Sequence, residues 1–257
     1  MIEGRKLNMK THFMPQETLE LLKPEDMGLV YTSVQRIELA KKPLQLESGE
    51  EELCLLCMEG TVRFFCGAAS GDAQKGDMLY VPIHSAIELE GEKAVLMRFG
   101  APCTKAYEFA HIPFLEVDGD SRHKVYGKTD NGTKRDVWNF IDEKFPSGRF
   151  LTGICFGGDG GWTAWPPHEH GLEREEVYIY FDMGESFGIQ CVYDELSTAK
   201  AYVVQNGHLI AIPKGYHPNC GSPHGGIRYM YCMVSTAEGE RDFMDLRIQS
   251  LFGDQLV

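Results

Sequence analysis

The stretch WPPHEHGLEREEVYIYF, residues 165–181, joins a cluster of histidines and glutamates to a run of alternating aromatic and aliphatic residues. That run predicts a strand. Because residues i and i+2 of a strand face the same way, His168 and His170 are expected to point to one side. Further along the chain, PKGYHP, residues 213–218, places His217 just after a Pro–Gly turn. Histidines and a glutamate from neighbouring strands suit a divalent first-row metal ion with positions open for a substrate.

The rest of the chain has the same strand-like character. Short runs rich in Val, Ile, Tyr, Phe and Leu are separated by Gly, Pro, Asn and Asp, which is typical of an all-β sandwich or barrel. Such runs occupy residues 61–65, 78–82, 94–100, 177–181, 187–193, 201–205, 208–213 and 229–234. A helical pattern is expected only at residues 17–22. The length of 257 residues suits two domains.

The two halves of the chain resemble each other. Residues 76–82 form a run that begins with Gly, ends in Pro and precedes His84, and residues 207–213 form a similar run that precedes His217. A repeat at this spacing predicts two copies of one β-barrel unit.

We expect an N-terminal domain over residues 9–130 and a C-terminal domain over residues 131–257. The first has a glutamate run at residues 50–52 where a histidine pair would stand, and only His84 later. It is therefore predicted to pack without a metal, whereas the second domain binds the metal.

The composition excludes several classes of protein. A net charge of −13 repels phosphate backbones, so nucleic acid is not an expected partner. No apolar run approaches the ~20 residues that cross a bilayer, and no apolar signal segment is present, so no membrane is expected. Eight cysteines without a signal segment indicate reduced thiols in the cytoplasm, and Cys54 and Cys57 are expected to be buried and inert.

Two segments carry a resemblance to the cupin superfamily. Residues 161–184, GWTAWPPHEHGLEREEVYIYFDMG, resemble its first motif, a Gly followed by His-x-His and then Glu. Residues 207–217, GHLIAIPKGYH, resemble its second motif, Gly-x5-Pro-x-Gly-x-x-His, with one residue missing before His217. A lone His-x-His is more often a surface pair, so it is the combination that favours a metal site. The resemblance implies two tandem cupin domains, a bicupin of jelly-roll β-barrels.

The spacing leaves the glutamate ligand open between Glu175 and Glu176. Glu175 stands at the usual cupin distance after His170, whereas Glu176 adjoins the strand at residues 177–181. Strand register is usually held better than loop length, so we expect Glu176 to be the ligand, with Glu175 as the alternative. The two side chains point to opposite faces of the strand, so only one can reach the metal.

Nearly the whole chain resembles a bacterial family that joins 5-deoxy-glucuronate isomerase with 5-dehydro-4-deoxy-D-glucuronate isomerase. The segments that carry this resemblance are GTKRDVWNFIDEKFPSGRFLTG, WPPHEH, FGIQCVYDE and IPKGYHP, at residues 132–153, 165–170, 187–195 and 212–218. The resemblance implies a set of metal ligands: His168, His170, Glu176 (or Glu175) and His217. It also implies an intramolecular oxidoreductase, an aldose–ketose isomerase of a sugar acid.

The first expected substrate is 5-deoxy-glucuronate, of inositol catabolism, because WPPHEH and PKGYHP look like the inositol enzyme. EEVYIYFDM and DFMDL look more like the enzyme of pectin breakdown, so 5-dehydro-4-deoxy-D-glucuronate is the alternative substrate. The expected cofactor is a divalent metal ion, zinc first, with manganese, iron or nickel as alternatives. The small sugar acid is the expected partner, and a homo-oligomer is left open.

An isomerase of this class needs a metal ion that polarises two neighbouring oxygens and a group that moves a proton. Tyr178 and Tyr180 share a side of the strand with Glu176, so they are the expected catalytic residues. Glu175 is a further candidate if its loop turns it inward. The expected substrate-binding residues, for the hydroxyl groups and the carboxylate, are Gln190, Lys214, Arg228, Tyr229 and Tyr231. Of the two cations, arginine matches a carboxylate better.

Two other functions fit the same metal site. A non-catalytic cupin would bind a sugar or a metal without turnover, and a cupin dioxygenase would need iron and molecular oxygen. An intact ligand set with a cation beside it for the carboxylate would favour the isomerase, because the fold alone does not decide function.

Overall fold

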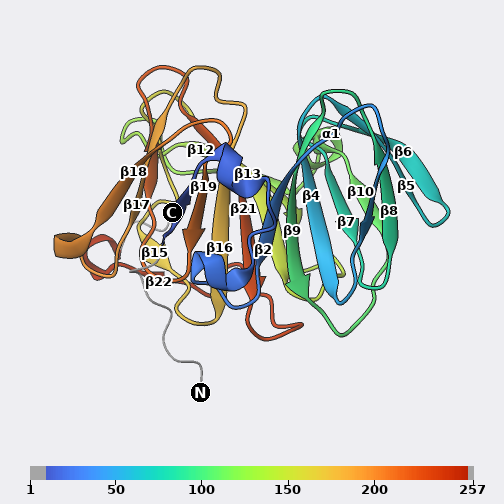
Figure 1. Ribbon diagram of the computed structural model, residues 1–257. Coiled ribbons are helices and arrows are strands. Elements are labelled where there is room, and N and C mark those ends of the chain that lie inside the picture. Colours follow the sequence, from blue (N-terminus) through green and yellow to red (C-terminus); the bar gives the residue numbers. More distant parts are fainter. Residues whose placement is uncertain (1–9, 254–257) are drawn as a thin grey trace.

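The computed structural model describes residues 10–253, which form mostly β-strands and turns (Figure 1). One short α-helix, α1 (Phe114–Asp118), and four 3₁₀ turns are the helical elements of this part of the chain. Every run that the sequence predicted to be a strand forms one, so the all-β expectation is confirmed. Residues 9 and 254–257, which belong to the expected domains, lie outside the described residues.

The helix expected at residues 17–22 is wrong. The chain forms only a 3₁₀ turn there, η1 (Pro15–Thr18), and the backbone of Leu22 instead exchanges hydrogen bonds with Val34. Because this bridge uses both the N–H and the carbonyl of Leu22, no helix can run through that residue.

The first half of the chain forms two antiparallel sheets. The larger has the order β10-β7-β4-β9-β2 and the smaller the order β3-β8-β5-β6. Their strands are β2 (Ser33–Glu38), β3 (Leu44–Glu47), β4 (Glu51–Glu59), β5 (Thr61–Cys66), β6 (Ala69–Gln74), β7 (Met78–Val81), β8 (Ala86–Glu90), β9 (Val95–Pro102) and β10 (Ala110–Ile112). A hydrophobic core lies between the two sheets, with Leu53, Val62 and Ile87 among its fully buried members.

The second half repeats this plan on a larger scale. A seven-stranded sheet has the order β1-β19-β16-β21-β13-β12-β11, and a four-stranded sheet has the order β14-β20-β17-β18. Their strands, with a separate pair β15 and β22, are β1 (His12–Phe13), β11 (His123–Tyr126), β12 (Arg135–Ile141), β13 (Phe150–Gly157), β14 (Trp162–Thr163), β15 (His168–Glu169), β16 (Arg174–Tyr180), β17 (Gly188–Val192), β18 (Lys200–Val204), β19 (Leu209–Ile212), β20 (Asn219–Gly221), β21 (Ile227–Ser235) and β22 (Arg247–Ile248).

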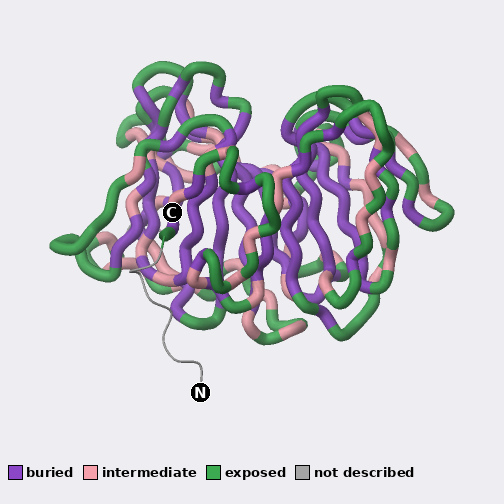
Figure 2. The backbone as a smooth tube through the Cα atoms, in the orientation of Figure 1, coloured by how far each residue is buried: buried purple, intermediate pink, exposed green. Residues whose placement is uncertain are grey.

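The two large sheets pack against each other at the centre of the molecule, where Figure 2 shows mostly buried chain. On β4, Cys54 and Leu56 belong to this central core, whereas Leu53 and Leu55 belong to the core of the first half. The strands of the large sheets are therefore buried on both faces. This is why they read as continuous apolar runs and not as an alternation of apolar and polar residues.

The sheets do not follow the expected boundary at residue 130. β1 pairs with β19, and β11 pairs with β12, so both of these strands lie in the seven-stranded sheet of the second half. The described chain therefore begins in the second half, enters the first at β2, and has returned by residue 123. The pairing of β1 with β19 joins residues far apart in the sequence, and no local pattern indicates it.

The strand orders of the two large sheets correspond, β7-β4-β9-β2 to β19-β16-β21-β13. Leu53 of β4 pairs with Val81, and Glu176 of β16 pairs with Ile212. Val81 and Ile212 hold the same place in the repeated run, directly before its proline. Leu53 therefore stands in the first half where Glu176 stands in the second.

The thiols of Cys54 and Cys57 are buried in β4. Burial raises the pKa of both, to about 12 for Cys57, so neither is a thiolate at neutral pH. This agrees with the expectation of inert thiols.

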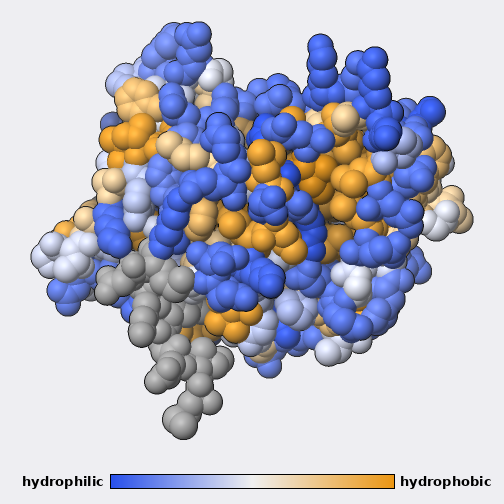
Figure 3. All heavy atoms as spheres, viewed as in Figure 1, coloured by the Kyte–Doolittle hydropathy of each residue, from blue (hydrophilic) through white to orange (hydrophobic). Residues whose placement is uncertain are grey.

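Hydrophilic residues cover much of the face in Figure 3, and apolar residues show between them mainly over the central strands. Within residues 10–253, no helix has the length and apolar character that crossing a membrane requires.

Candidate metal centre and its pocket

Three histidines and one glutamate meet in the second half of the molecule. His168 opens β15 and His170 follows that strand, Glu176 lies in β16, and His217 lies between β19 and β20. One donor nitrogen from each histidine lies within 4.8 Å of the other two. The ring centroids are 4.8, 5.3 and 5.4 Å apart. The structure thus brings together residues that the sequence motifs and the family resemblance indicated.

Three atoms of this cluster are buried and have no hydrogen-bond partner among residues 10–253, namely His170 Nε2, His217 Nε2 and Glu176 Oε2. The carboxylate oxygen lies 3.4 Å from His170 Nε2 and 3.0 Å from His217 Nε2. Buried polar atoms without partners are unfavourable unless a ligand completes them. Because imidazole nitrogens and a carboxylate are the donors that zinc and its neighbours accept, these residues fit a divalent metal ion.

Main-chain carbonyls orient two of the imidazole rings. His168 Nδ1 lies 2.9 Å from the carbonyl oxygen of Pro166, and His217 Nδ1 lies 2.8 Å from that of Gly215. A carbonyl oxygen only accepts, so Nδ1 carries the proton in both rings. Each Nε2 then keeps its lone pair for a metal ion.

Electrostatics within the cluster favour a cation beside Glu176. Burial lowers the pKa of His168 well below its usual range, and the two neighbouring imidazoles add to this, so the ring is neutral. Burial alone would raise the pKa of Glu176, but close contact with His170 and His217 outweighs burial and lowers that pKa. Burial likewise works against a charged His217, yet Glu176 raises its pKa above the usual value. The ionised carboxylate thus attracts positive charge, a proton or a metal ion.

Glu175 points to the opposite face of β16. Its carboxylate accepts hydrogen bonds from the main-chain N–H groups of Val30, Tyr31 and Thr32 at 2.8, 2.9 and 2.6 Å, and from the Thr32 hydroxyl at 2.7 Å. A carboxylate held in this way cannot reach the histidine cluster. The structure therefore contradicts the alternative of Glu175 as the metal ligand, and also its use as an inward-turned catalytic group.

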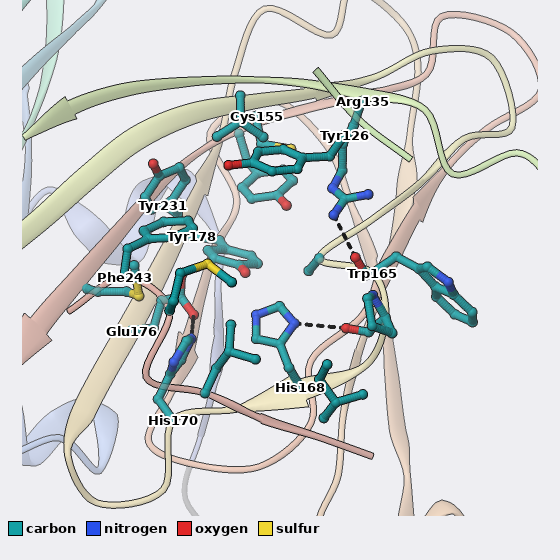
Figure 4. Close-up of a pocket in the computed structure, with 18 residues that line it drawn as sticks. Tyr126, Arg135, Cys155, Trp165, His168, His170, Glu176, Tyr178, Tyr231 and Phe243 are labelled. Atoms are coloured by element: carbon teal, nitrogen blue, oxygen red, sulfur yellow. Dashed lines mark hydrogen bonds and ion pairs between the residues drawn. The ribbon is translucent and has the colours of Figure 1, made fainter. Parts of the chain in front are cut away.

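A pocket opens beside the histidine cluster (Figure 4). Tyr178 and Tyr231 stand on one side of it, and Arg135 and Trp165 stand on the other. Apart from His168, His170, Glu176 and Arg135, the side chains that line the pocket are mostly aromatic or apolar. Such a pocket excludes water and leaves orientation of a ligand to a few polar groups.

Tyr178 lies where the sequence predicted, on the pocket wall beside the cluster. Its ring centroid is 5.9 Å from that of His217 and 4.3 Å from that of Tyr229. Within the described part of the chain no hydrogen bond involves its hydroxyl group, whereas the hydroxyl of Tyr231 donates to Asn139 Oδ1 at 2.7 Å. Burial raises the pKa of Tyr178 well above its usual range, with Glu176 adding to the effect, so this hydroxyl stays protonated.

Tyr180 and Gln190 belong to a buried hydrogen-bond network and do not line the pocket. The Tyr180 hydroxyl donates to Gln190 Oε1 at 2.6 Å, and Gln190 Nε2 donates to the main-chain carbonyl of His217 at 2.7 Å. Asn219 donates to the same Gln190 oxygen at 2.8 Å. The network holds the backbone that carries His217. The geometry thus gives these two residues a positioning role in place of the expected catalytic and substrate-binding roles.

The two cations expected to bind the substrate's carboxylate lie outside the pocket. Lys214 forms an ion pair with Asp194 at 2.9 Å, and Arg228 forms one with Asp182 at 2.8 Å. Side chains alternate along β21, so Arg228 faces away from the tyrosines of that strand. It lies over three aromatic rings of the central core, those of Phe114, Trp138 and Phe181. The structure contradicts both expected roles.

The pocket's own cation is Arg135, the first residue of β12. Its Nη2 donates to the carbonyl of Trp165 at 2.6 Å and its Nη1 to the carbonyl of Thr133 at 3.1 Å. Reasoning from the sequence missed this residue, although it lies within the segment at residues 132–153 that carries the family resemblance. Arg135 and Val137 lie two residues apart on β12 and both line the pocket, but nothing in the sequence marks which face of this strand meets the pocket.

Reasoning from the sequence also missed the role of the C-terminal segment, residues 241–248. β22 pairs with β15, the strand of His168. Arg241 fixes this segment by donating hydrogen bonds to the main-chain carbonyls of Asp142, Glu143, Phe145 and Phe150. Four side chains of the segment complete the pocket wall: Phe243, Met244, Leu246 and Ile248.

Comparison with known proteins places this site in a family. The model of the KduI/IolB family matches residues 9–245. The chain is 29% identical over 224 residues to a 5-deoxy-glucuronate isomerase of Geobacillus kaustophilus, with 78% of each chain covered. It is 34% identical over 113 residues to a protein of the same name from Bacillus licheniformis, with 40% of this chain and 41% of that one covered.

Solved structures show the same fold at lower identity. An IolB-like protein from Salmonella typhimurium superposes with a TM-score of 0.81 at 20% identity, covering 94% of this chain and 97% of that one. An oxalate decarboxylase from Lactobacillus farciminis superposes with a TM-score of 0.62 at 12% identity, covering 91% and 88%. These likenesses concern the fold, and they agree with the cupin-like architecture that the sequence motifs predicted.

The family relation expected from the sequence is confirmed, and the expectation of a sugar-acid isomerase agrees with the names of these relatives. The family model spans almost all of the described chain, including the three clustered histidines and Arg135. The chain belongs to the KduI/IolB family.

Proposed function

We propose that the protein is a metal-dependent aldose–ketose isomerase of a sugar acid, and that its substrate is 5-deoxy-glucuronate of inositol catabolism. One observation carries the proposal: buried atoms of His170, Glu176 and His217 that make no hydrogen bond within residues 10–253 converge beside His168, at the wall of a pocket that contains an arginine. The names of the curated relatives supply the substrate.

The residues that would hold the metal are His168, His170, Glu176 and His217, with zinc the first choice among zinc, manganese, iron and nickel. When bound, such an ion acts as a Lewis acid on a neighbouring carbonyl and hydroxyl oxygen of an open-chain sugar. The carbonyl contacts of His168 and His217 keep both rings oriented for this role.

The reaction moves hydrogen between two adjacent carbons and needs no second substrate. A proton leaves the carbon that carries the hydroxyl group, and a proton is added to the carbonyl carbon. At the same time the hydroxyl oxygen gives up its proton and becomes the new carbonyl oxygen, and the former carbonyl oxygen gains a proton. Tyr178 presents to the pocket a protonated hydroxyl group that makes no hydrogen bond with the residues the structure describes. We assign to it a hydrogen bond to the reacting oxygen on which negative charge develops.

Water must be kept from a sugar that is losing a proton at carbon. Trp165 and the C-terminal side chains around Leu246 supply an apolar wall beside the histidine cluster. In such surroundings, hydrogen bonds and charges act more strongly than in water.

We also propose that the two halves are tandem jelly-roll barrels, that is a bicupin, acting in the cytoplasm. The matching strand orders of the two large sheets support this. The strands β1 and β11 come from the first 130 residues but belong to the sheet of the second half. Leu53 at the place of Glu176 supports a first unit that packs and shapes the protein without a metal.

An NMR time course of the metal-loaded protein tests the proposal. One sample contains 5-deoxy-D-glucuronate, a second contains 5-dehydro-4-deoxy-D-glucuronate, and each has a control with a chelator. Metal-dependent conversion of the first substrate supports the proposal, and conversion of the second alone would assign the pectin pathway instead. Conversion of neither, with metal bound, would contradict the isomerase. Equal rates without oxygen would exclude a dioxygenase.

A further inference from the structure

We infer that Arg135 is the anchor for the substrate's carboxylate and sets the preference of the pocket for sugars that carry an acid group at the end remote from the reacting carbonyl. This inference rests on the proposed function and names the part of the site that recognises the substrate class.

The charge of Arg135 lacks an acidic partner among residues 10–253, whereas eight of the ten arginines in that range lie within 4.0 Å of an Asp or Glu oxygen. The other exception, Arg241, donates to four main-chain carbonyls and lies outside this pocket. A cation on an apolar pocket wall without a counter-charge is a recognition site for an anion.

The guanidinium group is held in one orientation. Its two carbonyl contacts, to Trp165 and Thr133, use one N–H of each terminal nitrogen, and its central carbon lies 5.4 Å from the centroid of the Tyr126 ring. The group has five N–H donors in a planar fork, so three remain for a ligand. An arginine fixed by carbonyls and an aromatic face loses little freedom when it binds a carboxylate.

The same short segment connects this anchor to the metal cluster. Arg135 binds the carbonyl of Trp165, and the imidazole of His168 binds the carbonyl of Pro166. Residues 165–168 read WPPH, and proline limits backbone freedom, so the segment fixes the spacing between the two ends of a bound ligand. Figure 4 shows Arg135 and the Glu176 side of the cluster on different sides of the pocket.

This arrangement selects a substrate class. In a uronic acid the aldehyde and its neighbouring hydroxyl lie at one end of the carbon chain, and the carboxylate lies at the other. A ligand with its carboxylate at Arg135 presents the opposite end to His168, His170 and Glu176. An uncharged aldose of the same length would leave the guanidinium without an acceptor.

Ligand binding to the metal-loaded protein tests the inference without turnover. The probes are D-glucuronate and D-glucose, titrated calorimetrically into wild type, R135Q, R135K and the control variant K214Q. Wild type and K214Q are expected to prefer D-glucuronate. R135Q is expected to bind D-glucuronate about 10- to 100-fold more weakly, with its affinity for D-glucose nearly unchanged. R135K is expected to keep part of the preference, because it keeps the charge but loses the fork.

The metal content and the thermal unfolding of each variant show whether it is folded. If R135Q does not fold, the R135K variant provides the test. The inference would be overturned if R135K preferred D-glucuronate over D-glucose as strongly as wild type does. Equal affinity of wild type for the two sugars, or an equal loss of both in R135Q, would also overturn it. If binding prefers D-glucuronate through Arg135 but the protein converts no sugar acid, only the proposed reaction is refuted. If R135Q converts a sugar acid with an unchanged KM, only the role of Arg135 as carboxylate anchor is refuted.

Discussion

Glu52 and Glu175 hold equivalent positions in the two large sheets, and each carboxylate binds main-chain amides that directly precede a strand of the other large sheet. Glu52 accepts from the N–H groups of residues 148 and 149 at 2.8 and 2.6 Å. Glu175 accepts from those of residues 30 and 31 at 2.8 and 2.9 Å, and from residue 32 at 2.6 Å. The strand registers make these two amide pairs equivalent as well. The two neighbouring glutamates of β16 therefore have different roles, because Glu175 connects the two large sheets and Glu176 faces the histidines.

Exchanging each of these glutamates for glutamine should separate the two roles. Glu175→Gln puts an amide NH₂ group against main-chain N–H donors, so the free energy of unfolding should fall by about 2 kcal/mol, while metal content stays near that of wild type. Glu176→Gln should lose metal affinity by at least about tenfold. Denaturant unfolding and metal analysis of the purified variants measure both effects. Loss of metal in Glu175→Gln with unchanged stability would reverse the assignment.

Removing a histidine should remove both the metal and the stability that the metal provides. In wild type, metal at about 1,000 times its Kd should stabilise the folded state by about 4 kcal/mol, since a ligand of the folded state shifts unfolding by mass action. His168→Ala should bind little metal, should not rise in Tm when metal is added, and should be inactive. Differential scanning calorimetry with and without a chelator checks this. A variant with stoichiometric metal and full turnover would refute the cluster as the metal centre.

The raised pKa of Glu52 predicts a pH-dependent stability. Burial raises this pKa above its usual value of 4.5, although hydrogen bonds from Tyr80 and from residues 148 and 149 oppose the shift. The folded state thus binds the proton more readily than the unfolded chain. The contribution of Glu52 to the free energy of unfolding should therefore fall as pH rises from about 4.5 through the folded-state pKa.

Urea unfolding of wild type and Glu52→Gln at several pH values isolates this contribution, because glutamine does not titrate. The stability of Glu52→Gln relative to wild type should increase as the pH rises through that interval. Glu88→Gln, at an exposed position of β8, is the matched control for replacing a glutamate with glutamine. A constant difference between wild type and Glu52→Gln across the range would contradict the raised pKa.

The candidate ligand set of His168, His170, Glu176 and His217 could be proposed from the sequence because strand period and motif spacing relate its members. His168 and His170 are related by the two-residue period of a strand, and the run that leads to His217 has a counterpart in the first half. Glu176 could be favoured over Glu175 because strand register ties it to the run at residues 177–181. These relations can be followed in the sequence itself, through strand period, motif spacing and the repeat between the two halves.

Arg135 could not be separated from Arg228 by such rules. Both lie on strands of the seven-stranded sheet, and both faces of that sheet are buried, so hydrophobic alternation does not mark which face meets the pocket. The pairing of β1 with β19 and the contact of Glu175 with residues 30–32 join distant parts of the chain. Only tertiary structure reveals relations of this kind.

Tyr178 and Tyr180 provide the sharpest test of the catalytic assignment, because they lie two residues apart on one strand and differ in their hydrogen bonding. The Tyr178 hydroxyl faces the pocket without a partner in the described chain, so Tyr178→Phe should leave stability within about 0.5 kcal/mol of wild type. If this hydroxyl stabilises charge on the reacting oxygen, kcat should fall about 100-fold or more, with the metal content retained.

Tyr180→Phe should behave in the opposite way. Its hydroxyl donates to Gln190, which supports the carbonyl of His217, so its loss leaves a buried acceptor with one donor fewer. The free energy of unfolding should fall by about 1 kcal/mol, and kcat should change less than in Tyr178→Phe. Steady-state kinetics and urea unfolding of the two variants, measured side by side, distinguish the roles. A larger loss of kcat in Tyr180→Phe than in Tyr178→Phe would move the catalytic assignment from the pocket wall to the buried network.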